Sequence, residues 1–310
     1  MRLLTTVFTV SAMLASVSCS PDSRWEAQSA VLHTVVVDGH PNAVWEKRPP
    51  DPVGAILLIH GRTWSGIPDF DLQVVGEELS LMDRLAEAGY AVYAHDLRGY
   101  GGTPRDSTEW ATPDRAVADV AAVLRWVNER TPAVGRPALF GWSFGSLVSH
   151  LTAQRHGDLI SVLMLYGHPF DPDLRIDIVP DTPDPERHVN TAEAAASDFI
   201  TPGTISGRAI EAYTAAALDA DPIRVDWRRL HEFNALDPAG IQVPTLVIHG
   251  EFDPLAPVES LAKTFTRLGT TDRRWVTIPN ADHAAHLEHP ARFVSEIIGF
   301  AQRGARGDGG

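Results

Sequence analysis

Short apolar runs alternate along this chain with longer stretches in which apolar residues recur at helical spacing. The apolar runs, which predict buried strands, cover residues 54–59, 90–94, 136–140, 159–166, 245–250 and 275–278. The stretches with helical spacing cover residues 77–88, 114–129, 146–153, 257–268 and 290–302. Strands that alternate with helices in this way indicate a mostly parallel sheet with helices on both faces. We therefore expect an α/β fold.

Two regions depart from the alternation. Strand patterns at 31–37 and 43–46 flank a turn at Asp38-Gly39 and suit an antiparallel hairpin at the edge of the sheet. Residues 168–238 begin with prolines and aspartates and are too long for an ordinary connection. Their helical patterns lie near 191–199, 207–218 and 223–233. We expect this segment to form an inserted cap, with a mere decoration of the sheet edge as the alternative.

The chain should thus consist of one sheet domain with an insertion. The sheet domain takes residues 31–167 and 239–302, and the cap takes residues 168–238. A linker at 20–30 precedes the sheet domain, and we expect a disordered tail at 303–310.

Residues 1–19 have the pattern of an export signal. Arg2 is followed by residues 3–17, which are apolar apart from small hydroxyl residues and too short to span a bilayer as a mature helix. Cys19, the only cysteine, stands where this stretch ends, as in a bacterial lipoprotein signal. The preceding Ser16-Val17-Ser18 lacks the leucine which that signal prefers. We expect an exported protein, either periplasmic, secreted or attached to a membrane through a lipid on Cys19, with simple removal of the leader as the alternative.

The composition narrows the classes of partner. A formal net charge of -14 over 310 residues argues against binding to nucleic acid or to anionic membrane surfaces. A single cysteine cannot form a disulfide within the chain, so the stability of the fold must come from its core. No acidic run in the sequence indicates a specific partner.

The sequence GWSFG at 141–145 carries the strongest chemical signal. It lies between a predicted strand and a predicted helix, which is the setting of a nucleophile elbow. Such a turn holds Ser143 in a strained backbone conformation with its hydroxyl exposed, and side chains in place of the two glycines would collide as strand and helix close together. Ser143 is therefore a candidate nucleophile.

An acid and a histidine follow in a matching arrangement. Asp253 comes after the strand at 245–250, and His283 comes after the strand at 275–278. Ligands in open α/β sheets bind at the carboxyl ends of the strands, so these side chains can converge on Ser143. A serine hydroxyl needs a base to activate it, and that base needs an acid to orient it.

Four motifs in order make the chain resemble the α/β-hydrolase family, in particular its cap-bearing serine hydrolases and esterases. They are His60-Gly61 after the third strand, Asp96–Gly101 after the fourth, the elbow, and the Asp and His segments. The resemblance covers 55–300 and implies an α/β-hydrolase-type sheet with an inserted helical cap. The segment at Asp96–Gly101 should be a structural turn, with Asp96 or Arg98 tying loops together.

The resemblance also assigns roles. It places the catalytic histidine directly after the loop that ends at Asp282, which favours His283 over His286 as the general base. His286 should then pack or hydrogen-bond beneath the site. Asp253 is preferred over Asp282 as the acid because it follows a strand and precedes a proline. Asp171 and Asp173 are less favoured substitutes for it.

The remaining site residues surround the serine. The backbone N–H of Phe144 should be one donor to the oxyanion, and by resemblance that of Arg62 the other. The Arg62 side chain could contact a substrate carboxylate or face solvent. Trp64 and Trp142 are candidates for the substrate pocket, although Trp142 could equally belong to the core.

We expect a serine hydrolase that cleaves a carboxylic ester of a small-molecule substrate through an acyl-enzyme. An aminopeptidase or amidase with the same triad is the first alternative, with acids of the cap such as Asp181, Asp184 and Glu186 holding the substrate amine. A hydrolase-fold protein that binds a ligand without turnover is the second. We expect no cofactor, and no metal at the closely spaced His283, His286 and His289, because they do not form a metal motif.

Overall fold

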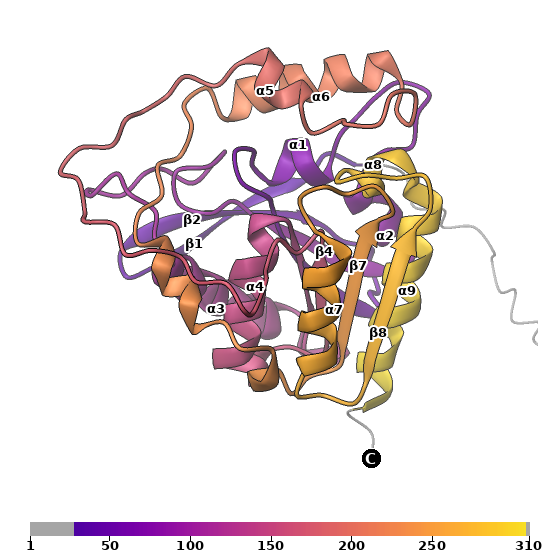
Figure 1. The fold of residues 1–310 in the computed structure, drawn as a ribbon. Coiled ribbons are helices and arrows are strands. Elements are labelled where there is room, and N and C mark those ends of the chain that lie inside the picture. Colours follow the sequence, from indigo (N-terminus) through magenta and orange to yellow (C-terminus); the bar gives the residue numbers. More distant parts are fainter. Residues whose placement is uncertain (1–27, 308–310) are drawn as a thin grey trace, which may run out of the picture.

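The structure, a computed structural model, describes residues 28–307. Its centre is an 8-stranded sheet in the order β1-β2-β4-β3-β5-β6-β7-β8 (Figure 1). The strands are β1 (Val31–Val37), β2 (His40–Lys47), β3 (Gly54–Ile59), β4 (Tyr90–His95), β5 (Ala138–Trp142), β6 (Leu163–Tyr166), β7 (Thr245–Gly250) and β8 (Arg273–Ile278). β2 runs antiparallel to β1 and to β4, and the other pairs are parallel. The mostly parallel sheet and its antiparallel edge hairpin are thus confirmed.

Helices cover both faces of this sheet (Figure 1). They are α1 (Gly66–Phe70), α2 (Leu81–Glu87), α3 (Pro113–Arg130), α4 (Phe144–His156), α5 (Ala192–Ala196), α6 (Gly207–Ala220), α7 (Val258–Arg267), α8 (Ala285–Glu288) and α9 (Pro290–Gly307). Short 3-10 turns are η1 (Pro132–Val134), η2 (Gly157–Leu159), η3 (Leu230–Ala235) and η4 (Pro238–Gly240). In the described part of the chain, no helix has the length and hydropathy needed to cross a membrane.

The core is split in two by the sheet, as the residues of β3 show. Leu57 and Ile59 pack into one apolar cluster with α3 and α4, whereas Ile56 and Leu58 pack into the other with α2 and α9. All four side chains are 0% exposed. A strand buried on both faces needs an uninterrupted apolar sequence, and this is why β3 shows no alternation of polar and apolar residues.

The segment between β6 and β7 arches over the carboxyl ends of the strands, with α5 and α6 at its top (Figure 1). Polar contacts tie it to loops of the sheet domain. Asp221 Oδ2 accepts from the Ser65 backbone N–H at 2.7 Å, and Asp282 Oδ2 accepts from the Ile200 N–H at 3.0 Å. The position of the segment fits the predicted cap, and its service as a substrate lid stays a prediction.

Two predicted features, one in the cap and one at the C-terminal end, differ from the structure. The helix expected near 223–233 is mostly extended, because Ile223 and Trp227 form bridges with Val189 and Ala111, and only η3 is helical. The tail expected from residue 303 is wrong in part, because α9 continues to Gly307. The export signal at 1–19 lies outside the described residues.

Candidate active site

The turn between β5 and α4 has the geometry of a nucleophile elbow. Ser143 has φ 53° and ψ -121°, a left-handed conformation that costs a residue with a side chain roughly 1–3 kcal/mol. The glycines permit a very close approach of strand and helix. A Cβ on Gly145 would lie 2.2 Å from His60 O, and one on Gly141 would lie 2.4 Å from Gly145 O. The turn therefore presents Ser143 at the carboxyl edge of the sheet.

A chain of buried polar side chains holds the Ser143 carbonyl. Ser146 Oγ donates to Ser143 O and contacts His168 Nδ1 at 2.7 Å, and His168 Nε2 lies 3.3 Å from His150 Nδ1. Burial lowers the pKa of His150 to about 4 and that of His168 well below its usual value, so each ring carries one N–H. In this series of hydrogen bonds each histidine donates from Nδ1 towards Ser143, and His150 Nε2 at its far end has no partner among the described residues.

His283 and Asp253 form a close pair. His283 Nδ1 lies 2.9 Å from Asp253 Oδ2 and 3.0 Å from Oδ1, and the two side chains are 3% and 0% exposed. An acid in contact with Nδ1 holds the proton on that nitrogen and leaves Nε2 free to act as a base. The predicted acid and histidine are therefore brought together.

Residues next to Ser143 fix the His283 backbone. The carbonyl of His283 accepts from Trp142 Nε1 at 3.0 Å and from the Tyr166 hydroxyl at 2.6 Å. The Tyr166 carbonyl in turn accepts from the Ser143 N–H at 2.8 Å. The elbow and the histidine loop are thus joined through β6.

The relation of Ser143 to His283 differs from that of His283 to Asp253. Among residues 28–307, the structure records no hydrogen bond between Ser143 Oγ and His283. Glycines leave room beside both groups: a Cβ on Gly61 would lie 3.5 Å from Ser143 Cβ, and one on Gly167 would lie 3.0 Å from His283 Cε1. Catalytic hydrogen bonds are often long without substrate and tighten when it binds.

Two backbone N–H groups beside Ser143 are available to an oxyanion. Phe144 is the first residue of α4, so its N–H has no partner within that helix. Neither its N–H nor that of Arg62 donates to a backbone carbonyl in the described structure. The Arg62 guanidinium lies over the Phe144 ring, with Cζ 5.9 Å from the ring centroid. Both predicted donors therefore border one corner of the site.

The neighbouring histidines have other partners. His286 Nε2 lies 2.8 Å from Asp69 O, and burial lowers the pKa of His286 to about 3, so we assign its single N–H to that nitrogen. His289 Nε2 lies 3.0 Å from Asn280 O. These contacts agree with the structural role expected for His286. The described residues contain no group of three or more His, Cys, Asp or Glu side chains that could hold a metal ion.

The competing acids are occupied elsewhere. Asp282 accepts from the backbone N–H groups of Ile200 and Ala284, the latter at 3.1 Å. Asp171 is bonded to Lys263 at 2.7 Å, and Asp173 to Arg267 at 2.7 Å. Only Asp253, among the acids considered, contacts the His283 ring.

A second group of polar residues at the site was not predicted. The Tyr213 hydroxyl, on α6, donates to Asp69 Oδ1 at 2.9 Å and lies 3.4 Å from Asp198 Oδ2. Burial raises the pKa of Asp69 well above its usual value and that of Asp198 to about 6, while the nearby His283 partly offsets the latter shift. The three residues come from separate segments, so no spacing in the sequence marks them.

Trp64 and Trp142 are nearly buried, at 2% and 3% exposed. Trp64 packs in an apolar cluster with Tyr213 and Leu287, under the cap segment. Trp142 stacks on Tyr166, with ring centroids 5.8 Å apart. Trp142 thus supports the site from the core side, and the substrate-pocket role of both residues stays a prediction.

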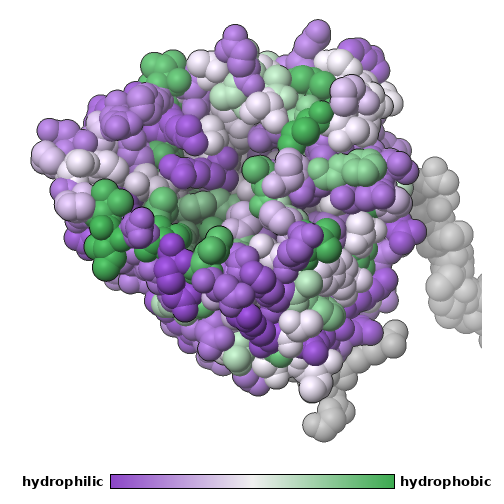
Figure 2. Space-filling model, viewed as in Figure 1, coloured by the Kyte–Doolittle hydropathy of each residue, from purple (hydrophilic) through white to green (hydrophobic). Residues whose placement is uncertain are grey.

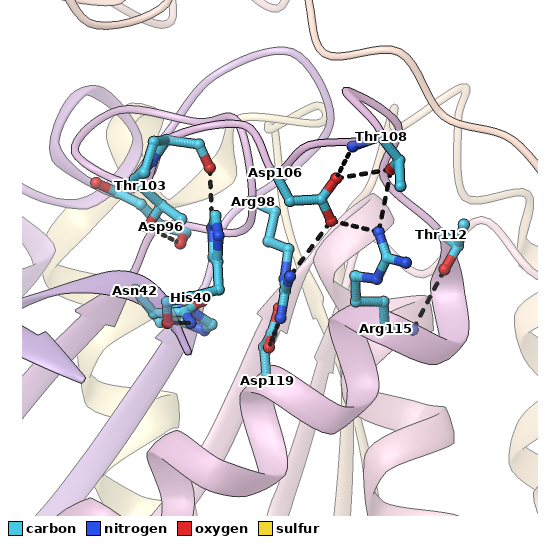
Figure 3. Close-up of polar contacts among 12 residues, drawn as sticks. His40, Asn42, Asp96, Arg98, Thr103, Asp106, Thr108, Thr112, Arg115 and Asp119 are labelled. Atoms are coloured by element: carbon cyan, nitrogen blue, oxygen red, sulfur yellow. Dashed lines mark hydrogen bonds and ion pairs between the residues drawn. The ribbon is translucent and has the colours of Figure 1, made fainter. Parts of the chain in front are cut away.

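The loop after β4 ties neighbouring elements together, as expected for a structural turn. Asp96 accepts from the N–H groups of Gly66 and Gly102, at 2.8 and 2.9 Å. Figure 3 shows Arg98 between Asp106 and Asp119, the latter on α3. Arg98 is thus paired with two acids and Asp96 accepts several N–H groups, so both side chains stabilise the edge of the site.

Comparisons with known proteins place the chain in a family. Residues 50–290 match the family model described as serine aminopeptidase, S33. The chain is 30% identical, over 227 residues, to a 2-hydroxy-6-oxo-6-(2'-aminophenyl)hexa-2,4-dienoic acid hydrolase of Metapseudomonas resinovorans, a match that covers 70% of this chain and 75% of the relative.

Solved structures show the same fold. A hydrolase from Pseudomonas aeruginosa matches with a TM-score of 0.65 at 19% identity, over 87% of this chain and 97% of its own. Proline iminopeptidase of Mycobacterium smegmatis matches with a TM-score of 0.64 at 19% identity, over 89% and 99%. The sheet, the elbow and the family match agree, and the chain therefore belongs to the serine aminopeptidase S33 family and is a hydrolase of the α/β-hydrolase superfamily.

Proposed function

We propose that this protein is a serine hydrolase which cleaves a carboxylic ester through an acyl-enzyme on Ser143. His283 is the general base and Asp253 orients it. The backbone N–H groups of Phe144 and Arg62 stabilise the oxyanion. One observation carries the proposal: a strained serine at φ 53° stands in the elbow, on the same side of the sheet as a histidine held by a carboxylate at 2.9 Å.

The proposed reaction has two halves, formation and hydrolysis of the acyl-enzyme, and each catalytic group acts in both. The Ser143 hydroxyl attacks the ester carbonyl while His283 Nε2 takes its proton. The oxygen that becomes negative is stabilised by the two N–H groups, and removal of one such donor typically costs about 10²–10³ in rate. His283 then returns the proton to the departing alcohol. Water, with His283 again as the base, then attacks the acyl-enzyme carbonyl, and Ser143 and the free acid are released.

Labelling by a fluorophosphonate probe tests this proposal. The probe should react with Ser143, which peptide mass spectrometry can locate, and should fail to react with the Ser143→Ala variant. Ser149→Ala is the matched control, because Ser149 is also buried on α4 and its hydroxyl has no partner among the described residues; that variant should still be labelled. A folded protein that takes up no label would instead support the alternative of a ligand-binding protein without turnover.

An aminopeptidase or amidase with the same triad is the second candidate. Asp198 lies in the cap segment near His283 and shares Tyr213 with Asp69, so a carboxyl pair could receive a substrate amine. Two of the three cap acids first considered for this role have other partners, because Asp181 pairs with Arg229 at 2.7 Å and Glu186 contacts His188. A panel of aminoacyl anilides and simple esters decides, since faster hydrolysis of the anilides would favour this candidate.

We also propose that the protein is exported, on the pattern of residues 1–19 alone. Mass spectrometry of the mature N-terminus should find diacylglyceryl-Cys19 or a free residue close to it. An intact Met1 in the native host would contradict export.

A further inference from the structure

A cleft of about 400 Å³ opens beside the candidate oxyanion site. Residues of the cap segment form most of its wall, and Arg62 and Trp110 of the sheet domain complete it. Its lining comprises Arg62, Trp110, Thr182, Glu186, His188, Arg224, Val225, Asp226 and Trp227. The cleft holds both acidic and basic side chains. The charge of the ligand that it would bind therefore depends on which of these side chains already have partners.

Its acids are paired. Asp226 Oδ2 accepts from Arg105 Nη1 and from the Arg187 backbone N–H, both at 3.3 Å. Glu186 is engaged by His188 Nε2. Each carboxylate of the cleft therefore already has a hydrogen-bond partner within the protein.

Its cations are not paired. Within residues 28–307 the guanidinium groups of Arg62 and Arg224 form no hydrogen bond or ion pair, and both side chains are exposed to the cleft. Burial lowers the pKa of Arg62 and the charge of Arg224 lowers it further, while Tyr100 and the Asp226 carboxylate partly offset these effects. The two guanidiniums therefore lie close enough to repel each other. Trp110, 9% exposed, also lines the cleft, and its indole N–H is buried without a partner among the described residues.

The cleft adjoins the proposed reaction centre through two contacts. The Arg62 guanidinium lies over the ring of Phe144, whose backbone N–H is one of the oxyanion donors. The same ring packs edge-on against Trp227, with centroids 4.5 Å apart, and Trp227 lines the cleft. A substrate bound at Ser143 can therefore extend past Phe144 to the two arginines.

We propose that Arg62 and Arg224 form a subsite for a carboxylate of the substrate. The inference rests on the proposed ester hydrolysis and narrows its substrate to esters that carry an anionic group on the acyl or the alcohol side. Planar guanidinium groups bind carboxylates through paired hydrogen bonds. An anion placed between two unpaired guanidiniums also relieves their mutual repulsion.

The body of the substrate should be apolar. A second hollow of about 260 Å³ shares Trp110, Thr182 and Trp227 with the arginine cleft. Most of its exposed lining area is apolar, and charged side chains stand among the apolar ones. The rest of its lining comprises Ile176, Asp177, Val179, Pro180, Asp181, Arg228, Arg229, Leu230 and His231. Figure 2 shows hydrophobic patches beside hydrophilic surface on the side of the molecule that carries the segment between β6 and β7. An ester with an aliphatic or aromatic body and a carboxylate group fits the hollow and the arginine cleft together.

Two matched ester pairs test the subsite. Mono-p-nitrophenyl glutarate against p-nitrophenyl valerate places the charge on the acyl side, and para-acetoxybenzoate against its methyl ester places it on the alcohol side. The wild type should prefer the anionic member of one pair by about 10-fold or more in kcat/KM. Arg62→Gln, which keeps the backbone N–H, and Arg224→Gln should each reduce this preference about 10-fold.

Arg125→Gln is the control, because it removes the same charge from an exposed position on α3. It should leave the preference unchanged. If the neutral esters are hydrolysed but the anionic ones gain nothing, or if neither cleft variant lowers the preference, the subsite is disproved while the ester hydrolase stands.

A binding measurement separates the two proposals. If no ester of either pair is hydrolysed, the proposed function fails, and calorimetric titration of mono-p-nitrophenyl glutarate into the Ser143→Ala variant still decides the subsite. Weaker binding after Arg62→Gln or Arg224→Gln on that background supports it. Equal or undetectable binding in all of them overturns it.

Discussion

The turn around Ser143 and the cap segment at 168–238 are held in place in different ways. In the turn, backbone touches backbone: a Cβ on Gly145 would lie 2.2 Å from His60 O. In the cap, Gly203 and Gly207 have nothing within 4 Å of an added Cβ. The cap instead depends on polar bonds to the sheet domain, such as that from the Ile200 N–H to Asp282, and on the apolar cluster of Tyr213 with Trp64 and Leu287.

This difference suits the two tasks proposed for them. A nucleophile needs a fixed position, since about 1 Å of misplacement can cost about 10²-fold in rate. A cap that selects substrates needs side chains which can change without unfolding the sheet. The turn around Ser143 and the cap segment should therefore respond very differently to substitution.

Glycine-to-alanine exchange should give the largest contrast. Gly145→Ala places a methyl group inside contact distance of two backbone carbonyls and should cost more than about 4 kcal/mol, enough to prevent folding. Gly207→Ala, at the first residue of α6, should raise stability by about 0.5 kcal/mol. Urea unfolding measures both. A well-folded Gly145→Ala protein would show that the turn is less crowded than described.

Removal of the tie between cap and sheet domain should have an intermediate effect. Asp282 is 0% exposed and accepts N–H groups from Ile200 and Ala284. Asp282→Ala should lower the free energy of unfolding by about 2 kcal/mol, because it leaves donors unpaired. Asp181→Ala, which breaks an exposed pair with Arg229, should change it by less than about 0.5 kcal/mol. Equal losses in both variants would refute the special role of Asp282.

The dependence of stability on pH should separate the regions further. Burial lowers the pKa of His286 from 6.5 to about 3, so the folded state binds this proton less readily than the unfolded state. Its contribution is fully present above pH 6.5 and is lost as pH falls towards 3, by up to about 1.4 kcal/mol per pH unit. His286→Gln should flatten the fall measured by urea unfolding between pH 6.5 and 5. The exposed cap variant His188→Gln should leave it unchanged.

The sequence predicted the sheet domain well because its signals are local. Apolar runs bounded by turns correspond to the strands, and β1, β3 and β7 have the predicted bounds. The elbow and the order of Asp253 and His283 were visible because each follows a strand. The family match and the strand order agree with the fold that these motifs implied.

The cap could not be predicted as well, because its structure depends on contacts between distant segments. Residues 223–227 have helical spacing but pair with Val189 and Ala111 as extended chain. Arg224 and Asp198 carry no motif, and only the folded chain places them beside Arg62 and His283. Substrate recognition is therefore the part of the function that the sequence conceals.

The most direct test of the triad combines Ser143→Ala and His283→Ala. If the two groups act as one unit, each single variant should lower kcat for a p-nitrophenyl ester by about 10⁴–10⁶, and the double variant should be no slower than either, with the thermal midpoint of unfolding preserved. Losses that multiply in the double variant, or turnover that survives Ser143→Ala, would contradict the account.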